Sequence, residues 1–119
     1  MGYYATTAKN TMLGSITVNS LSLHTDNPGA AGTSNEYSGG GYARQSATFG
    51  TAAEGKRKLS SAVAFSGTPG DQVSWVGFWS SSTFRGAKEI TDAPKVFHAD
   101  TGLLVLLKDD TYYGIDECA

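Results

Sequence analysis

The segment Gln72–Ser80, with sequence QVSWVGFWS, most constrains the fold because it is apolar on both faces of an extended strand. Successive side chains of a strand point to opposite faces. One face would carry Val73, Trp75, Gly77 and Trp79, and the other would carry Val76 and Phe78. A strand with two apolar faces is covered on both sides, which predicts a central position in its sheet.

Short strand-like segments separated by turn-forming residues make up most of the remaining chain. Turn clusters such as 66–71 (SGTPGD) and 99–102 (ADTG) separate them. We expect strands at 16–25, 42–49, 59–65, 83–90, 95–98 and 103–108, with an edge strand at 111–113. The run 103–107 (LLVLL) is continuous and fits a core strand. This spacing predicts an all-β protein, a single-domain β-sandwich of jelly-roll-like type.

Residues 3–13 (YYATTAKNTML) depart from the strand pattern and predict a short N-terminal helix. Tyr4, Ala5, Ala8 and Met12 fall on one helical face. The helix either closes one end of the sandwich or docks on another chain. A chain of 119 residues fits one domain, so residues 1–119 form a single unit with the helix at about 3–13 and the sandwich at about 16–113.

Composition and charge exclude several classes of protein. With 39% hydrophobic and 17% charged residues, the chain does not resemble a charge-rich disordered one. A net charge of −2 without a basic stripe argues against nucleic-acid binding, and the Lys-Arg-Lys run at 56–58 fits a solvated strand edge. No apolar run reaches the length of about 18 residues that a membrane span needs. The lone Cys118 cannot form an internal disulfide or a cysteine-based metal cage.

The stretch Ser20–Phe49 predicts a strand, a long turn-rich loop and a second strand. Leu21, Leu23 and Thr25 alternate with polar residues, as in a half-buried strand. The turn DNPG at 26–29 ends this strand, and the chain resumes at Tyr42 after three glycines. Such a loop is suited to presenting a surface, and it contains no recognisable reaction centre.

The candidate catalytic and ligand-binding residues form only weak patterns. His24 and His98 each precede an aspartate by two residues, which fits a metal ligand or an oriented base, but also a histidine that ends a strand and completes a turn. The glycines at 39–41 lack the Lys-Ser/Thr of a phosphate-binding loop. The oxygen-bearing side chains of Asp26, Asn27, Asn35 and Glu36 do not follow calcium-loop spacing. We therefore predict no catalytic residue, no cofactor and no metal, and hence no enzyme.

The same stretch resembles a family. The pattern is a strand ending in L-H-T, a D-x-P-G turn, a polar glycine-rich loop and G-Y-A-R at the next strand. The matching residues are Leu23, His24, Thr25, Asp26, Pro28, Gly29, Gly41, Tyr42, Ala43 and Arg44. This resembles small virion structural proteins of long-tailed bacteriophages, described as minor tail or tail-fibre-associated proteins. The resemblance fades after Asp92.

The resemblance implies a virion structural protein, a minor tail or tail-tip/fibre-associated component, that acts through subunit contacts. Two alternatives stay open: a capsid decoration or head-fibre protein, and a carbohydrate-binding host-recognition module that stacks sugars on Trp75, Trp79, Tyr37 and Tyr42. The implied partners are other virion proteins and further copies of the chain, with a host-surface glycan as a further candidate and with no nucleic acid or membrane. The implied location is the virion, after synthesis in the host bacterial cytoplasm. The expected contact residues are Tyr4, Met12, His24, Asp26, Asn35, Tyr37, Tyr42 and Arg44.

Overall fold

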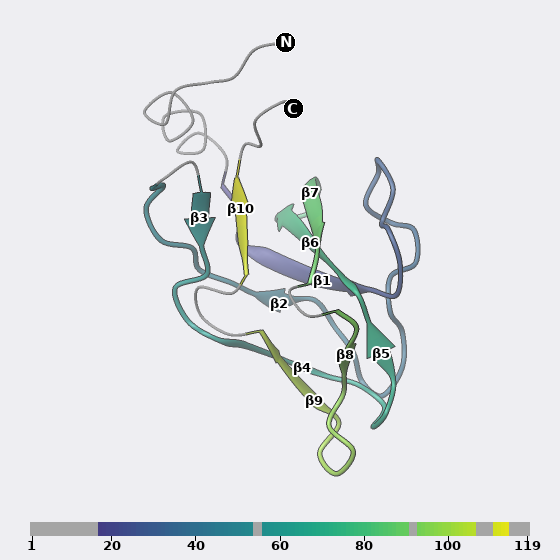
Figure 1. Ribbon diagram of the computed structural model, residues 1–119. Helices are drawn as coiled ribbons and strands as arrows, with labels where there is room; N and C mark the ends of the chain where they lie inside the picture. The colour runs from purple at the N-terminus through teal and green to yellow at the C-terminus, as the bar shows by residue number, and fades with distance from the viewer. Residues whose placement is uncertain (1–16, 54–55, 91–92, 107–110, 115–119) are drawn as a thin grey trace.

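The computed structural model describes residues 17–53, 56–90, 93–106 and 111–114, and these contain ten strands and no helix (Figure 1). The all-β prediction is confirmed. The expected helix at 3–13, with Tyr4 and Met12, lies outside the described residues. The strands are β1 (Ser20–His24), β2 (Gln45–Ser46), β3 (Lys56–Lys58), β4 (Val63–Ser66), β5 (Gln72–Val73), β6 (Trp75–Ser80), β7 (Thr83–Glu89), β8 (Lys95–Val96), β9 (Leu103–Leu106) and β10 (Tyr112–Gly114).

The largest sheet has four antiparallel strands in the order β2-β1-β6-β7. Strand β6 lies between β1 and β7, and its residues from Val76 to Trp79 are all buried. The central, doubly covered position predicted for this segment is therefore confirmed. Along β1, Leu21 pairs with Phe78 and Leu23 pairs with Val76, which aligns their side chains across the two strands.

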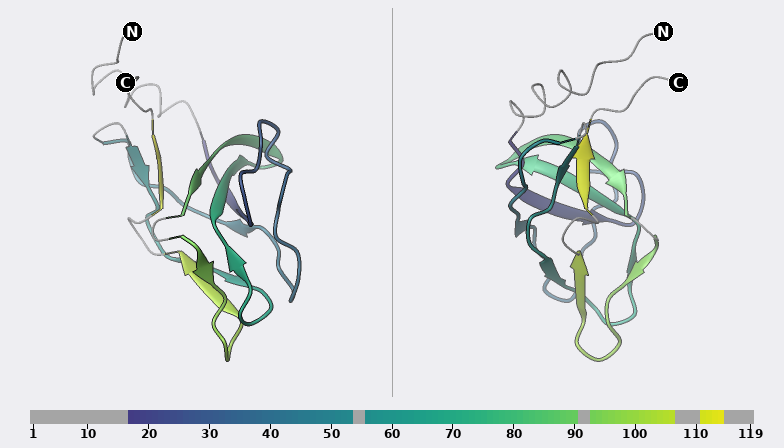
Figure 2. Two further views of the ribbon diagram at one scale, coloured as in Figure 1. Left: turned by 45° about the vertical axis from the view of Figure 1, so that its right-hand side comes forward. Right: turned by 60° about the vertical axis from the view of Figure 1, so that its left-hand side comes forward.

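The other strands form three two-stranded antiparallel ladders, β10–β3, β4–β9 and β5–β8. Figures 1 and 2 show the β4–β9 ladder below the four-stranded sheet, with β3 and β10 beside the sheet at the other end. The pairing of β10 along an edge was expected, and the Lys-Arg-Lys run is itself the strand that it pairs with. The turn 99–102 is confirmed, since Gly102 N–H donates to the His98 carbonyl at 2.9 Å.

The hydrophobic core lies between the sheet and the ladders. Phe65 and Phe97 are fully buried in it, and Phe49 packs edge-on against Phe78 with ring centroids 6.0 Å apart. The sheet contributes what we call the apolar face, formed by the inward side chains of the two central strands: Leu21, Leu23, Val76 and Phe78. Burial of apolar area is the main favourable term in folding, so the hydrophobic core to which this face belongs provides most of the stabilisation.

Three strand predictions need correction. Val73 belongs to the core cluster with Val76 and Phe78 and not to the opposite face, because the pairing changes at Ser74 from the β5–β8 ladder to the four-stranded sheet. The run 103–107 was expected to lie wholly in the core, but its described residues alternate between exposed and buried. The strand expected at 42–49 is reduced to Gln45–Ser46, since the residues before it belong to a loop.

Candidate functional site

The loop expected after β1 leaves and rejoins the same edge of that strand. After His24 the chain runs through residues 25–35 and returns to the strand edge, where Glu36 forms a bridge with His24. Residues 37–44 then leave the edge before Gln45 pairs with Leu21. We call residues 26–41 the Asp26–Gly41 loop. Leu23 pairs with Val76 of β6 on one side, but on the loop side its backbone lies beyond the β1–β2 pairing.

Two tyrosines satisfy the Leu23 backbone in place of a strand. The Tyr37 N–H donates to the Leu23 carbonyl, and the Leu23 N–H donates to the Tyr42 hydroxyl, both at 2.9 Å. Buried backbone groups are nearly always paired, so this arrangement holds the loop against the strand without a regular ladder. Burial raises the pKa of the Tyr42 hydroxyl; the Leu23 bond opposes this shift, and the bond to Glu36 adds to it.

The side of the sheet opposite the core, which we call the polar face, carries Ser22, His24, Gly77 and Trp79. The half-buried strand expected here is instead buried on both sides, because both Ser22 and His24 have no exposed surface. The loop covers this face. A Cβ atom on Gly32 would clash with the ring of Phe84, and that ring lies against Trp79 with centroids 5.2 Å apart.

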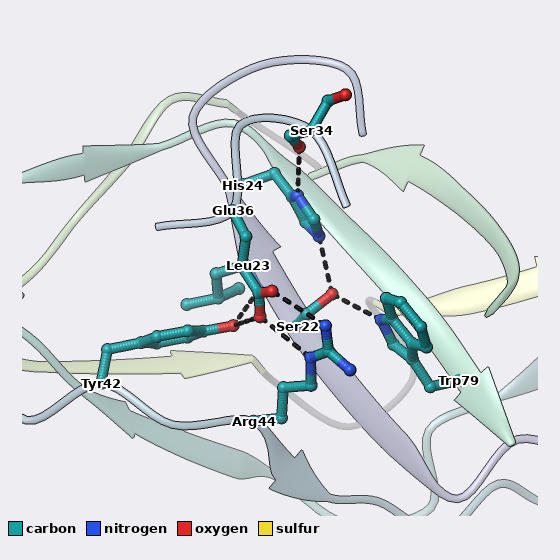
Figure 3. A network of polar contacts seen from close by, with 8 residues as sticks. All are labelled: Ser22, Leu23, His24, Ser34, Glu36, Tyr42, Arg44 and Trp79. Atoms are coloured by element: carbon teal, nitrogen blue, oxygen red, sulfur yellow. Dashed lines mark hydrogen bonds and ion pairs between the residues drawn. The ribbon is translucent and has the colours of Figure 1, made fainter. Parts of the chain in front are cut away.

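A chain of three hydrogen bonds runs across the polar face and ends on the loop (Figure 3). The Trp79 indole N–H donates to the Ser22 hydroxyl at 2.8 Å. The hydroxyl lies 2.7 Å from His24 Nε2, and His24 Nδ1 lies 2.9 Å from the Ser34 carbonyl oxygen. Because a carbonyl only accepts, Nδ1 carries the ring proton and Nε2 accepts from Ser22. The chain of donors therefore runs from Trp79 through Ser22 to His24 in one direction.

The Ser22–His24 pair has the distance of an activated serine beside its general base, but not the setting. A nucleophile needs a path to substrate, and both side chains are fully buried. The hydroxyl already uses its donor on His24 and an acceptor site on Trp79. Burial lowers the pKa of His24, and the hydrogen bond to Ser34 opposes this shift without reversing it. The lowered pKa keeps the ring neutral at pH 7. The pair fixes the loop and has no accessible reacting atom.

Glu36 holds together the outer side of the same network. Its two carboxylate oxygens accept from Arg44, at 3.0 Å from Nε and 2.9 Å from Nη2, and it also accepts from the Tyr42 hydroxyl at 2.8 Å. Burial alone would raise the pKa of Glu36, but the bonds from Arg44 and Tyr42 outweigh it and lower the pKa. The Arg44 guanidinium also lies over the Trp79 ring, 3.7 Å from its centroid.

The far end of the loop is attached to the turn between β4 and β5. The Tyr37 hydroxyl donates to Asp71 at 2.8 Å and accepts from the Thr68 N–H at 3.0 Å. The Tyr37 ring stacks on Phe97 with centroids 4.8 Å apart. Gly40 has a φ of 53°, and a Cβ atom there would clash with the backbone of Gly67 and Thr68. The glycines at 39–41 therefore lie in a turn that packs closely against its neighbour at Gly40.

The structure divides the expected contact residues into three groups. Asp26 and Asn35 are exposed on the loop, where Asp26 accepts from the Asn27 N–H and Asn35 donates to the Asn27 carbonyl. Tyr42 and Arg44 lie at the rim of the network. His24 and Tyr37 are buried and bond to the loop backbone or to the turn beside it. Tyr4 and Met12 lie outside the described residues.

Sequence reasoning missed the shared roles of Ser22, Glu36 and Trp79. A signal for them was Gly77, which the sequence places between two tryptophans. A Cβ atom at Gly77 would clash with the Ser22 hydroxyl and approach His24 Nε2 and Trp79 Nε1, each at 3.1 Å. The residue leaves room for a polar cluster on a strand that otherwise appears wholly apolar.

The described residues assemble no metal centre, and two of the four rings expected to stack on sugars are buried. Within the described ranges, no three His, Cys, Asp or Glu side chains converge as metal ligands. His98 is exposed, and its Nδ1 accepts from the Asp100 N–H at 3.1 Å, so it completes a turn. Of the four rings expected to stack on sugars, Trp79 and Tyr37 are only 4% and 6% exposed. No helix in the described ranges is both long and apolar enough to cross a bilayer.

Comparison with protein-family models shows which family the chain is related to. Residues 4–93 match the model of the family described as podophage GP4 fiber I protein gp80. The chain belongs to this family. Membership of a phage virion structural family is therefore supported, whereas the specific L-H-T to G-Y-A-R pattern and the attribution to long-tailed phages are not. The match ends close to Asp92, where the resemblance was expected to fade. No curated protein and no solved structure matched the chain.

Proposed function

We propose that this chain is a non-enzymatic structural component of the phage tail fibre and works through subunit contacts made by the Asp26–Gly41 loop. Family membership supports the fibre assignment. The loop supports the contact assignment, because most of its residues are exposed while its base is bonded at several points. A loop ordered before binding loses less conformational entropy when a partner docks.

The observation that carries the proposal is the chemical state of the network beneath the loop. Its serine and histidine bond to each other, the histidine also bonds to the Ser34 carbonyl, and the Glu36 carboxylate accepts from Arg44 and Tyr42. Such a network positions a surface and leaves no group free for catalysis. The surface above it consists of short polar and small side chains, among them exposed Ala31 and Thr33.

Localising the chain in intact particles tests the fibre assignment. Antibody labelling or cryo-electron microscopy of whole virions should place the chain at the tail fibre. Signal on the head would reject this assignment in favour of a capsid decoration or head-fibre protein.

A pair of loop variants tests the contact assignment. Ala31→Arg combined with Thr33→Arg adds bulk and charge to the loop without touching its supports. We expect particles from phage supplied only with this variant to lack the chain, although the purified protein keeps its melting temperature. Thr48→Arg with Thr51→Arg adds the same charge at exposed sites outside the loop and should incorporate normally. Normal incorporation of the loop variant would place the contacts elsewhere.

The glycan-binding alternative is weaker, since Trp79 and Tyr37 are buried and Tyr42 uses its hydroxyl inside the network. Of the four rings, those of Trp75 and Tyr42 are half-buried. Binding of host-surface glycans to the purified chain, abolished by Trp75→Ala, would revive it.

A further inference from the structure

The β4–β9 ladder has one face in the core and one face in solvent. Val63, Phe65, Leu104 and Leu106 are buried. Their alternating neighbours form what we call the β4–β9 outer face: Ala64, Ser66, Leu103 and Val105. Leu103 and Val105 are 43% and 44% exposed, although both are large apolar side chains.

The alternation of side chains explains why the inner residues of β4 and β9 are apolar. It does not explain why Leu103 and Val105 on the outer face are apolar as well. A solvent-facing strand side usually carries polar residues. Among the described residues, the exposed large hydrophobic side chains are Leu103, Val105 and Val96. Val96 belongs to β8, which is joined to β9 by the 99–102 turn. The exposed large apolar residues therefore lie on β8 and β9, on either side of one turn.

The three ladders differ in how their edges are protected. Strand β3 presents exposed Lys56 and Lys58, and β8 carries Lys95 directly after Pro94. Lysine and proline at a sheet edge discourage pairing with another chain. The sequences VAFS of β4 and LLVL of β9 contain neither, nor any charged residue. Both are edge strands, because the described part of the structure pairs them only with each other.

We propose that the β4–β9 outer face packs against the same face of a second copy of this chain. An uncharged apolar face is complementary to itself, because bringing two copies together creates no like-charge contact. The partner assignment deepens the proposed fibre function and rests on it, since a fibre brings copies of its components together.

The surface differs from the contact loop. Figure 1 shows the β4–β9 ladder at the lower end, and the loop reaches this end at the turn after β4, where Gly40 packs against the backbone of Gly67 and Thr68. Strand β9 also lies beyond residues 4–93, which match the family. The chain would then use the loop for one set of neighbours and the β4–β9 outer face for its own copies.

Sedimentation velocity of the full-length chain over a range of concentrations tests the inference. Wild type should associate reversibly, and Leu103→Lys combined with Val105→Lys should weaken self-association by at least about 100-fold, as expected when buried interface anchors become like charges. Ser46→Lys with Thr83→Lys adds the same charges at exposed strand positions and should associate as wild type does. A monomeric wild type, or equal association of the Leu103/Val105 variant, overturns the inference.

A second measurement covers a variant that fails to fold. Hydrogen–deuterium exchange of wild type should show more protection at 103–106 at high protein concentration than at low, and no concentration dependence there overturns the inference. Antibody labelling of particles keeps the two proposals apart. If the chain is found in the fibre but its self-association does not depend on Leu103 and Val105, only the role of the β4–β9 outer face is refuted. If the chain is found on the head, the fibre function is refuted.

Discussion

The two faces of the central β1–β6 pair are both buried, yet they are built from opposite chemistry. The apolar face packs Leu21 and Leu23 into the core, and the polar face directs Ser22 and His24 toward the Asp26–Gly41 loop. Apolar burial scales with area and has little directional preference. Hydrogen bonds add little net stability but require specific partners in specific places. One face therefore holds the molecule together, and the other determines where the loop lies.

The largest expected effect is on the apolar face. Leu23→Ala removes a fully buried side chain and leaves a cavity, so it should lower the free energy of unfolding by about 2–5 kcal/mol. Chemical denaturation followed by tryptophan fluorescence measures it. Val96→Ala, at a 49% exposed position of β8, is the control and should change the free energy of unfolding by less than about 0.5 kcal/mol. Equal losses in the two variants would show that the core is not centred on this face.

A smaller effect is expected on the polar face. Ser22→Ala leaves the Trp79 N–H and His24 Nε2 without their shared partner, and an unsatisfied buried group costs about 1–3 kcal/mol. The loop should also lose protection from hydrogen exchange at residues 26–41, because His24 is no longer held toward Ser34. Ser60→Ala is the control, since its hydroxyl is bonded on the surface to the Thr48 carbonyl. A stability loss without any change in loop exchange would separate the polar face from loop placement.

The sequence was sufficient to predict the apolar face but not the polar one. Alternation in β1 and the two apolar faces of β6 are local patterns, and local patterns identify strands and a central position well. The polar face depends on contacts between residues far apart in the chain, such as Trp79 with Ser22 and Tyr37 with Asp71. No spacing rule predicts which loop closes over which strand.

For β9 a local pattern was present but led to the wrong prediction. The run LLVL predicts a strand buried on both faces, because a continuous apolar run does not show whether one face or both faces are covered. The interpretation of His24 was closer to the structure. A histidine ending a strand and completing a turn was one of the two readings, and its ring indeed bonds to the Ser34 carbonyl of the loop.

The two faces also differ in their response to pH, because only the polar face contains a titratable side chain, His24. Burial lowers the pKa of His24 from its ordinary value of 6.5, so below pH 6.5 the unfolded chain binds a proton that the folded chain does not. The contribution to stability is complete above that pH and is lost as the pH falls toward the folded pKa. Glu36 acts with the same sign only below 4.5, because its pKa is also lowered.

Between pH 6.5 and 4.5 the stability of wild type should therefore fall with a slope of at most about 1.4 kcal/mol per pH unit from His24. His24→Gln cannot take up this proton and should flatten the slope, while lowering stability at pH 7 through its altered hydrogen bonds. His98→Gln is the matched control, because the exposed His98 ring lies outside the network, and it should keep the wild-type slope. Urea unfolding at a series of pH values measures all three. A slope that persists in His24→Gln and disappears in His98→Gln would mean that the polar face does not titrate, and that the two faces differ in geometry alone.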